Sequence, residues 1–129
     1  MKPYQLLGRK YRVGADFVSR SEGDCLSLVA VVMAHYGIDF PDPQRAWYRR
    51  YLRGDADVFR DELQKWGHLT NDIECGTVAL CRAYDGFGLA SFYEDGWISF
   101  IGLEVRWSPL EALQIVELYC PRKSSSATS

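Results

Sequence analysis

The chain has 129 residues, of which 47% are apolar and 25% are charged, and its formal net charge is −2. This length fits one domain, and the composition supports a hydrophobic core and excludes a disordered chain. The small net charge gives no support to a nucleic-acid partner. No stretch approaches the roughly 20 apolar residues of a membrane span.

The cysteines and the first residues predict the compartment. Residues 1–5 lack the apolar core of a secretory signal, so we expect the protein to be made in the cytoplasm. None of the four cysteines belongs to a C-x-x-C pair of the kind that binds zinc or exchanges disulfides. They are therefore expected to be reduced thiols, and the sequence predicts neither a metal site nor a cofactor. The cysteines are Cys25, Cys75, Cys81 and Cys120.

The N-terminal half predicts helices. Residues 1–20 are basic and irregular, and a loop then ends at Asp24, a good helix N-cap. The apolar residues 25–36 predict a helix that is buried nearly all round and stops at Gly37. Two shorter helices are expected at residues 45–52 and 58–66, the second ending at Gly67.

From Gly76 onward, apolar residues recur at every second position, which predicts strands. Glu94, Asp95 and Gly96 form a hairpin signal through the Asp-Gly pair, and one helical turn is expected at residues 109–113. The expected strands are residues 77–82, 87–93, 97–101, 104–107 and 115–119. The sequence thus predicts an α+β domain over residues 1–121, with N-terminal helices on an antiparallel sheet of about five strands. Residues 122–129 are expected to be a disordered tail.

A basic run is followed at once by an acidic run. Two interpretations are open: solvated helix faces of opposite sign, or a docking patch for a partner subunit. The basic residues are Arg45, Arg49, Arg50 and Arg53, and the acidic residues are Asp55, Asp57, Asp61 and Glu62.

Cys25 stands at the head of the first long helix, where the helix dipole favours a thiolate by about 0.3–1 kcal/mol. This lowers the thiol pKa by roughly 0.2–0.7 units, which leaves it mostly protonated at neutral pH. A nucleophilic cysteine normally has a histidine as its base. His35 is on the same helix, roughly 15 Å along the axis, and cannot serve. His68, in a loop, is the other histidine that could reach the sulfur.

Three segments resemble the NlpC-type papain-like cysteine peptidases, the cell-wall endopeptidases of bacteria and of bacteriophage tails. Residues 8–14, with Tyr11, are similar to the family's upstream Gly…Tyr…Gly element, whose tyrosine lies beside the catalytic cysteine. Residues 24–41, from the Asp-Cys pair to Gly-Ile-x-x-Pro, resemble the nucleophile helix and its exit. Residues 76–80 and 87–96 resemble the first two core strands with their hairpin. The resemblance implies a papain-like fold with Cys25 as the former nucleophile.

The same resemblance implies that the catalytic base is missing. The family's histidine stands seven residues before the hairpin aspartate, and here that position is Gly88. A shift of one residue reaches Phe87 or Leu89, neither of which accepts a proton. The third polar group of the family falls near Ser99. Cys25 is then either a small apolar side chain that fills space in the core, or a nucleophile that is slow or needs a base from a partner chain. Tyr11 contributes either packing or a substrate contact.

The resemblance supports three functional hypotheses. The first is a structural protein, a degenerate domain in the tail tip or baseplate of a phage or phage-like particle, with other tail proteins as partners and Arg45, Arg49, Arg50 and Arg53 in the contact. The second is a peptidoglycan stem-peptide hydrolase that uses Cys25. The third is a module that binds a peptidoglycan peptide without cutting it.

Overall fold

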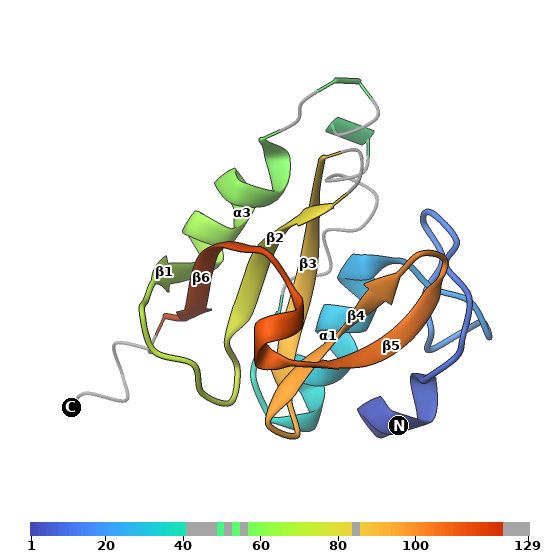
Figure 1. Ribbon diagram of the computed structural model, residues 1–129. Coiled ribbons are helices and arrows are strands. Elements are labelled where there is room, and N and C mark those ends of the chain that lie inside the picture. The colour runs from blue at the N-terminus through green and yellow to red at the C-terminus, as the bar shows by residue number, and fades with distance from the viewer. Residues whose placement is uncertain (41–48, 51–52, 55–56, 84–85, 123–129) are drawn as a thin grey trace.

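The computed structural model describes residues 1–40, 49–50, 53–54, 57–83 and 86–122. In this part of the chain, two α-helices accompany a six-stranded antiparallel sheet (Figure 1). The helices are α1 (Cys25–His35) and α3 (Val58–Trp66). The strands are β1 (Gly67–Leu69), β2 (Val78–Ala83), β3 (Gly86–Tyr93), β4 (Gly96–Ile101), β5 (Glu104–Pro109) and β6 (Ile115–Pro121). The predicted α+β class is confirmed.

Both helices cover the same face of the sheet. Helix α1 lies against β3 and β4, and α3 lies against β1 and β6. Nearly every residue from Leu26 to Met33 is buried, which confirms that α1 is enclosed almost all round. The main core joins these helices to alternate residues of the strands, including Leu80, Leu89 and Ile98. Burial of this apolar surface is the main force that holds the layers together.

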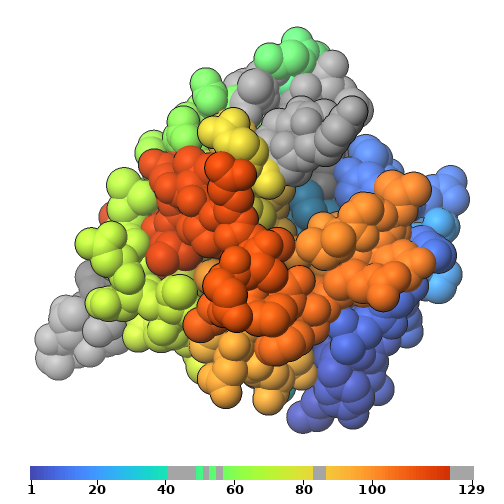
Figure 2. All heavy atoms as spheres, viewed as in Figure 1, coloured from blue at the N-terminus to red at the C-terminus, as the bar shows by residue number. Residues whose placement is uncertain are grey.

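The opposite face of the sheet carries a second, smaller cluster. It consists of Ala79, Cys81, Ala90 and Trp97, with Leu113, Ile115 and Leu118 packed against it. The connection from β5 to β6 crosses this face through a 3-10 turn, η2 (Leu110–Ala112), and appears orange-red at the front of Figure 2. The Trp97 indole N–H donates to the Leu110 carbonyl at 3.1 Å, which fixes the connection to β4.

The strand order is β1-β6-β2-β3-β4-β5, so β1 and β5 form the edges. The N-terminal segment runs along β5 and appears blue beside orange strands in Figure 2. It begins with a 3-10 helix, η1 (Pro3–Leu6). The Gly8 N–H donates to the Val105 carbonyl, and the Val105 N–H donates to the Arg9 carbonyl, both at 2.9 Å. These bonds cover part of an edge that would otherwise be open to pairing.

The β3–β4 hairpin has a two-residue turn at Glu94 and Asp95, whose φ angles are 50° and 60°. Positive φ at both central residues is typical of the type I′ turn that suits the twist of a hairpin. The sequence predicts the loop at Glu94, Asp95 and Gly96, and the structure confirms the hairpin but limits its turn to the first two of these residues. Gly96 instead opens β4, where a Cβ would lie 2.4 Å from the Ser108 carbonyl oxygen.

Other predictions differ from the structure in detail. The sheet has six strands because the short β1 follows α3 directly, where the sequence predicts only a helix stop at Gly67. The 3-10 helix η1 lies in a region expected to be irregular, whereas η2 confirms the predicted turn. Of the helix predicted at residues 45–52, Arg49 and Arg50 are helical and the rest lies outside the described residues. None of the described helices is long and apolar enough to cross a membrane. The predicted tail, apart from Arg122, also lies outside the described residues.

Candidate functional site

Helix α1 begins at Cys25, and Asp24 fixes that start. The Asp24 carboxylate accepts hydrogen bonds from the backbone N–H of Ser27 at 2.8 Å and of Gly14 at 3.1 Å. Asp24 is fully buried, whereas Cys25 is partly exposed at the margin of the main core. The cap therefore holds the Cys25 thiol at the N-terminal end of the helix, in the position that the sequence predicts.

Tyr11 lies beside this helix start. It forms an isolated parallel bridge with Gly23, and its backbone N–H donates to the Leu103 carbonyl at 2.8 Å. Its ring meets Phe100 edge-on with centroids 5.1 Å apart, and Phe100 stacks on Phe17 at 6.0 Å. Tyr11 and the start of α1 therefore do come together, and the ring of Tyr11 packs on the aromatic side chains of Phe100 and, behind it, Phe17.

Strand β3 points alternate side chains to the two faces of the sheet. Leu89 packs in the main core below α1, while Ala90 belongs to the cluster on the other face. Gly88 lies opposite Cys81, a member of that second cluster, so a side chain at position 88 would point away from α1. Ser99 pairs with Ala90 and faces the same way. The positions predicted for the histidine and for its polar partner are thus both on the face that α1 does not cover.

The Ser99 hydroxyl lies on that face without a polar contact. It is buried and, among the described residues, has no hydrogen-bond partner. Its ladder partners are Ala90 in β3 and Arg106 in β5. In this position the hydroxyl cannot orient a base beside Cys25.

The neighbours of Gly88 lie on the other face of β3. A shift of one residue in the resemblance reaches Phe87 or Leu89. Phe87 packs against the main core, which includes α1, and the guanidinium carbons of Arg60 and Arg82 lie 5.3 and 5.6 Å from its ring centroid. Neither Phe87 nor Leu89 can take a proton, so none of the three positions expected for the base carries one.

His35 is the first of the two histidines. It is exposed in the last turn of α1, with its ring 5.0 Å from that of Tyr36 and 5.7 Å from that of Tyr93. Because it stands at the opposite end of the helix from Cys25, it cannot act on that thiol, as the sequence predicts.

His68 lies in β1, directly opposite Cys120 in β6. Its Nε2 atom is 3.0 Å from the Cys120 Sγ atom. The neighbouring Tyr119 belongs to the main core, so alternation places Cys120 and His68 on the face away from the helices. His68 therefore contacts Cys120 and not Cys25, the cysteine for which the sequence suggests it as a base.

This pairing could not be found from the sequence. His68 and Cys120 are 52 positions apart, and the residues around each of them do not predict that β1 pairs with β6. The β1 segment is three residues long, too short to show an alternating pattern.

The other two thiols lie in different surroundings. Cys75 is exposed in the loop before β2, so it does not share a strand face with Cys81. Burial raises the pKa of the Cys81 thiol to about 11. Burial, with a smaller effect of the nearby Cys75, raises the pKa of Tyr36 to about 12. No disulfide joins any of the four cysteines.

The basic run is partly neutralised within the chain. The Arg50 guanidinium lies 2.8 Å from a Glu62 carboxylate oxygen and 3.6 Å from one of Asp61. Arg49 and Arg53 are exposed, and Arg45 lies outside the described residues. The structure therefore joins the basic and acidic runs through Arg50 and leaves Arg49 and Arg53 facing solvent.

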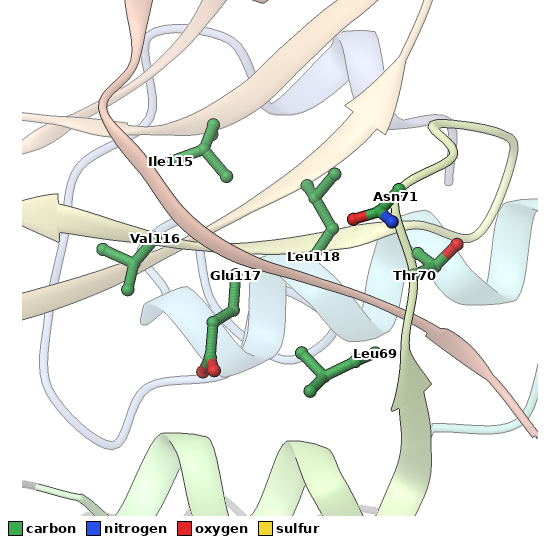
Figure 3. Close-up of a pocket in the computed structure, with 7 residues that line it drawn as sticks. All are labelled: Leu69, Thr70, Asn71, Ile115, Val116, Glu117 and Leu118. Carbon is green, nitrogen blue, oxygen red and sulfur yellow. The ribbon is translucent and has the colours of Figure 1, made fainter.

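Two pockets lie away from Cys25. The first, of about 350 Å³, opens between β6 and the chain that leaves β1. Figure 3 shows Leu118 and Asn71 on one side of the β6 ribbon and Glu117 and Leu69 on the other. The second, of about 400 Å³, is apolar and lies between η1 and the β3–β4–β5 strands. It is lined by Tyr4, Leu7, Tyr93, Glu94, Ile98 and Trp107.

The site as a whole combines a capped thiol with apolar neighbours. The helix dipole favours the thiolate by about 0.3–1 kcal/mol, which does not by itself produce a strong nucleophile.

Comparison of the chain with models of protein families, with curated proteins and with solved structures found no match in any of the three.

Proposed function

We propose that this chain is a structural domain of the NlpC type that has lost its catalytic base and is built into the tail tip or baseplate of a phage or phage-like particle. The observation that carries the proposal is the place of the ionisable groups around α1. Cys25 stands where the resemblance puts the nucleophile. The positions where the resemblance puts the base, Gly88 and its two neighbours, cannot take a proton, and both histidines lie elsewhere.

The shape of the domain supports the same family. A capped helix with cysteine as its first residue lies on an antiparallel sheet, and a tyrosine from the upstream segment packs beside it. These are the features that the resemblance to the peptidases implies. The aromatic contacts of Tyr11 with Phe100, and of Phe100 with Phe17, give that tyrosine a packing role.

An assembly role needs surfaces for partner subunits, and the chain has two. Tyr4, Leu7 and Trp107 are exposed apolar side chains around the second pocket, and Arg49 and Arg53 are exposed cations. Aromatic and arginine side chains are the usual anchors of protein interfaces. We therefore place tail-protein contacts at these two surfaces.

Incubation with purified muropeptides tests the loss of catalysis. We expect no cleavage by the wild-type chain and none by Cys25→Ala. Cleavage by the wild type that Cys25→Ala abolishes would overturn the proposal. The tail assignment is tested separately by the neighbouring genes: tail-tube, hub or baseplate genes support it, and an unrelated setting contradicts it.

A peptidoglycan peptidase is the second candidate, because the Cys25 thiol is partly exposed at the start of a capped helix. This activity needs a base lent by another chain. The pH dependence of Cys25 alkylation distinguishes the two functions: an apparent pKa of about 8–9 fits the structural role, and one below about 6 requires such a base.

A further inference from the structure

A cysteine other than Cys25 has a histidine beside it, on the face of the sheet away from α1. Cys120 and His68 are cross-strand neighbours in β6 and β1, and their Sγ and Nε2 atoms are 3.0 Å apart. The Nδ1 atom is farther away, at 3.9 Å, so the sulfur meets one nitrogen of the ring. We propose that this pair is a reactive-thiol site that forms mixed disulfides with low-molecular-weight disulfides.

The chemistry of the pair is that of an activated nucleophile. The imidazole takes the thiol proton, and the resulting thiolate is the form that attacks a disulfide sulfur. A bond forms between Cys120 Sγ and one sulfur of the reagent, and the bond between the two reagent sulfurs breaks. The departing thiolate takes the proton from the His68 imidazolium, so the step needs no external oxidant.

Cys81 is an internal reference against which the reactivity of Cys120 can be compared. Both Cys81 and Cys120 are 8% exposed, so burial disfavours the two thiolates to a similar degree. The Cys81 thiol faces a backbone carbonyl, that of Gly88, at 3.4 Å, and its pKa is raised to about 11. Cys120 instead faces an imidazole whose histidine is exposed to solvent. The difference in partner, rather than in burial, separates the two thiols.

The surrounding charges do not oppose a thiolate at Cys120. Arg122 follows two residues later, and its guanidinium donates to the Gln64 carbonyl at 2.7 Å. On α3, Lys65 lies 3.2 Å from Glu62. In β6, Glu117 is on the other side of the strand and is paired with Arg60 at 2.8 Å.

The loop that follows β1 carries two acidic residues, Asp72 and Glu74, and both are exposed to solvent. Exposed carboxylates interact weakly with a buried group because water screens them.

The first pocket opens near this pair but is not lined by it. Leu69, which follows His68, and Leu118, two residues before Cys120, both line the pocket (Figure 3). Its lining includes neither His68 nor Cys120, so the proposal rests on the contact between the sulfur and the imidazole and not on the pocket.

Competitive labelling with iodoacetamide tests the proposal, with the modified peptides resolved by mass spectrometry. At neutral pH, Cys120 should react at least about tenfold faster than Cys81, because the imidazole can accept the thiol proton and favours the thiolate. In His68→Gln the Cys120 rate should fall about tenfold while the Cys81 rate stays the same. Equal rates for the two thiols, or an unchanged Cys120 rate in His68→Gln, would overturn the proposal.

A second measurement uses oxidised glutathione as the disulfide. The wild type should gain one glutathione at Cys120, Cys120→Ser should gain none at that position, and Cys25→Ala should behave as the wild type. Modification confined to the exposed Cys75 contradicts the proposal. Thermal unfolding checks that His68→Gln is folded, and because His68 is exposed we expect little change in stability.

Discussion

Gly88 lies opposite Cys81 in the ladder between β2 and β3, and the Cys81 thiol donates a hydrogen bond to the Gly88 carbonyl at 3.4 Å. This relationship decides on which face of the sheet a side chain at position 88 would lie. It puts the position on the side of the small cluster, with the whole sheet between it and α1.

A histidine introduced into β3 should therefore affect the Cys25 thiol from position 87 but not from position 88. Phe87→His introduces an imidazole on the α1 face and should lower the apparent pKa of Cys25, measured by alkylation rate against pH. Gly88→His is the matched control: it should leave Cys25 unchanged and alter the labelling of Cys81. A response of Cys25 to Gly88→His, or none to Phe87→His, would contradict the assignment of these two positions to opposite faces of the sheet.

Asp24→Ala should destabilise the domain by about 2–3 kcal/mol, because it removes the cap and leaves the Gly14 N–H without its partner. Urea unfolding measures the change. Asp57→Ala is the control, since Asp57 precedes α3 in the same position but its side chain makes no capping hydrogen bond. Equal losses in the two variants would show that the Asp24 bonds contribute little.

Gly8→Pro should expose the edge of β5 and cause association between copies. The substitution removes the N–H that bonds Val105, and Gly8 has a φ of 84° that proline cannot adopt. Size-exclusion chromatography over a range of concentrations should show larger species. Gly8→Ala keeps the N–H and should cost only about 1–2 kcal/mol of stability without association. The prediction is wrong if both variants elute as the wild type does.

The stability of the protein should fall above pH 9 because of Cys81. Its pKa rises from an ordinary value of 9.0 to about 11 in the folded state, so folding favours the protonated thiol. The contribution is complete below the ordinary value and is lost as the pH rises through the folded value, at up to about 1.4 kcal/mol per pH unit.

Urea unfolding at several pH values measures this slope. Cys81→Ala should flatten it between pH 9.0 and 10.0, below the ordinary pKa of Tyr36 and Tyr119, whose raised pKa values add their own slope at higher pH. Cys75→Ala, which removes an exposed thiol, should retain the slope in the lower part of this range. An unchanged slope in Cys81→Ala would assign the effect to other groups.

The sequence by itself determined the elements whose signals are local. Asp24 as a cap, the apolar run after it and Gly37 as a stop specify α1, because capping and helix termination act within a few residues. The alternating pattern specifies β2 to β6, and the scarcity of histidines left His68 as the single candidate base for Cys25.

Only the tertiary structure decided which side chains meet. A strand pattern does not say which face a helix will cover, and the pairing of Gly88 with Cys81 puts the expected base position on the face away from α1. The pairing of β1 with β6, which brings His68 to Cys120, joins segments distant in sequence. Such contacts depend on how the whole chain packs its apolar faces, and that information is not contained in any local stretch of residues.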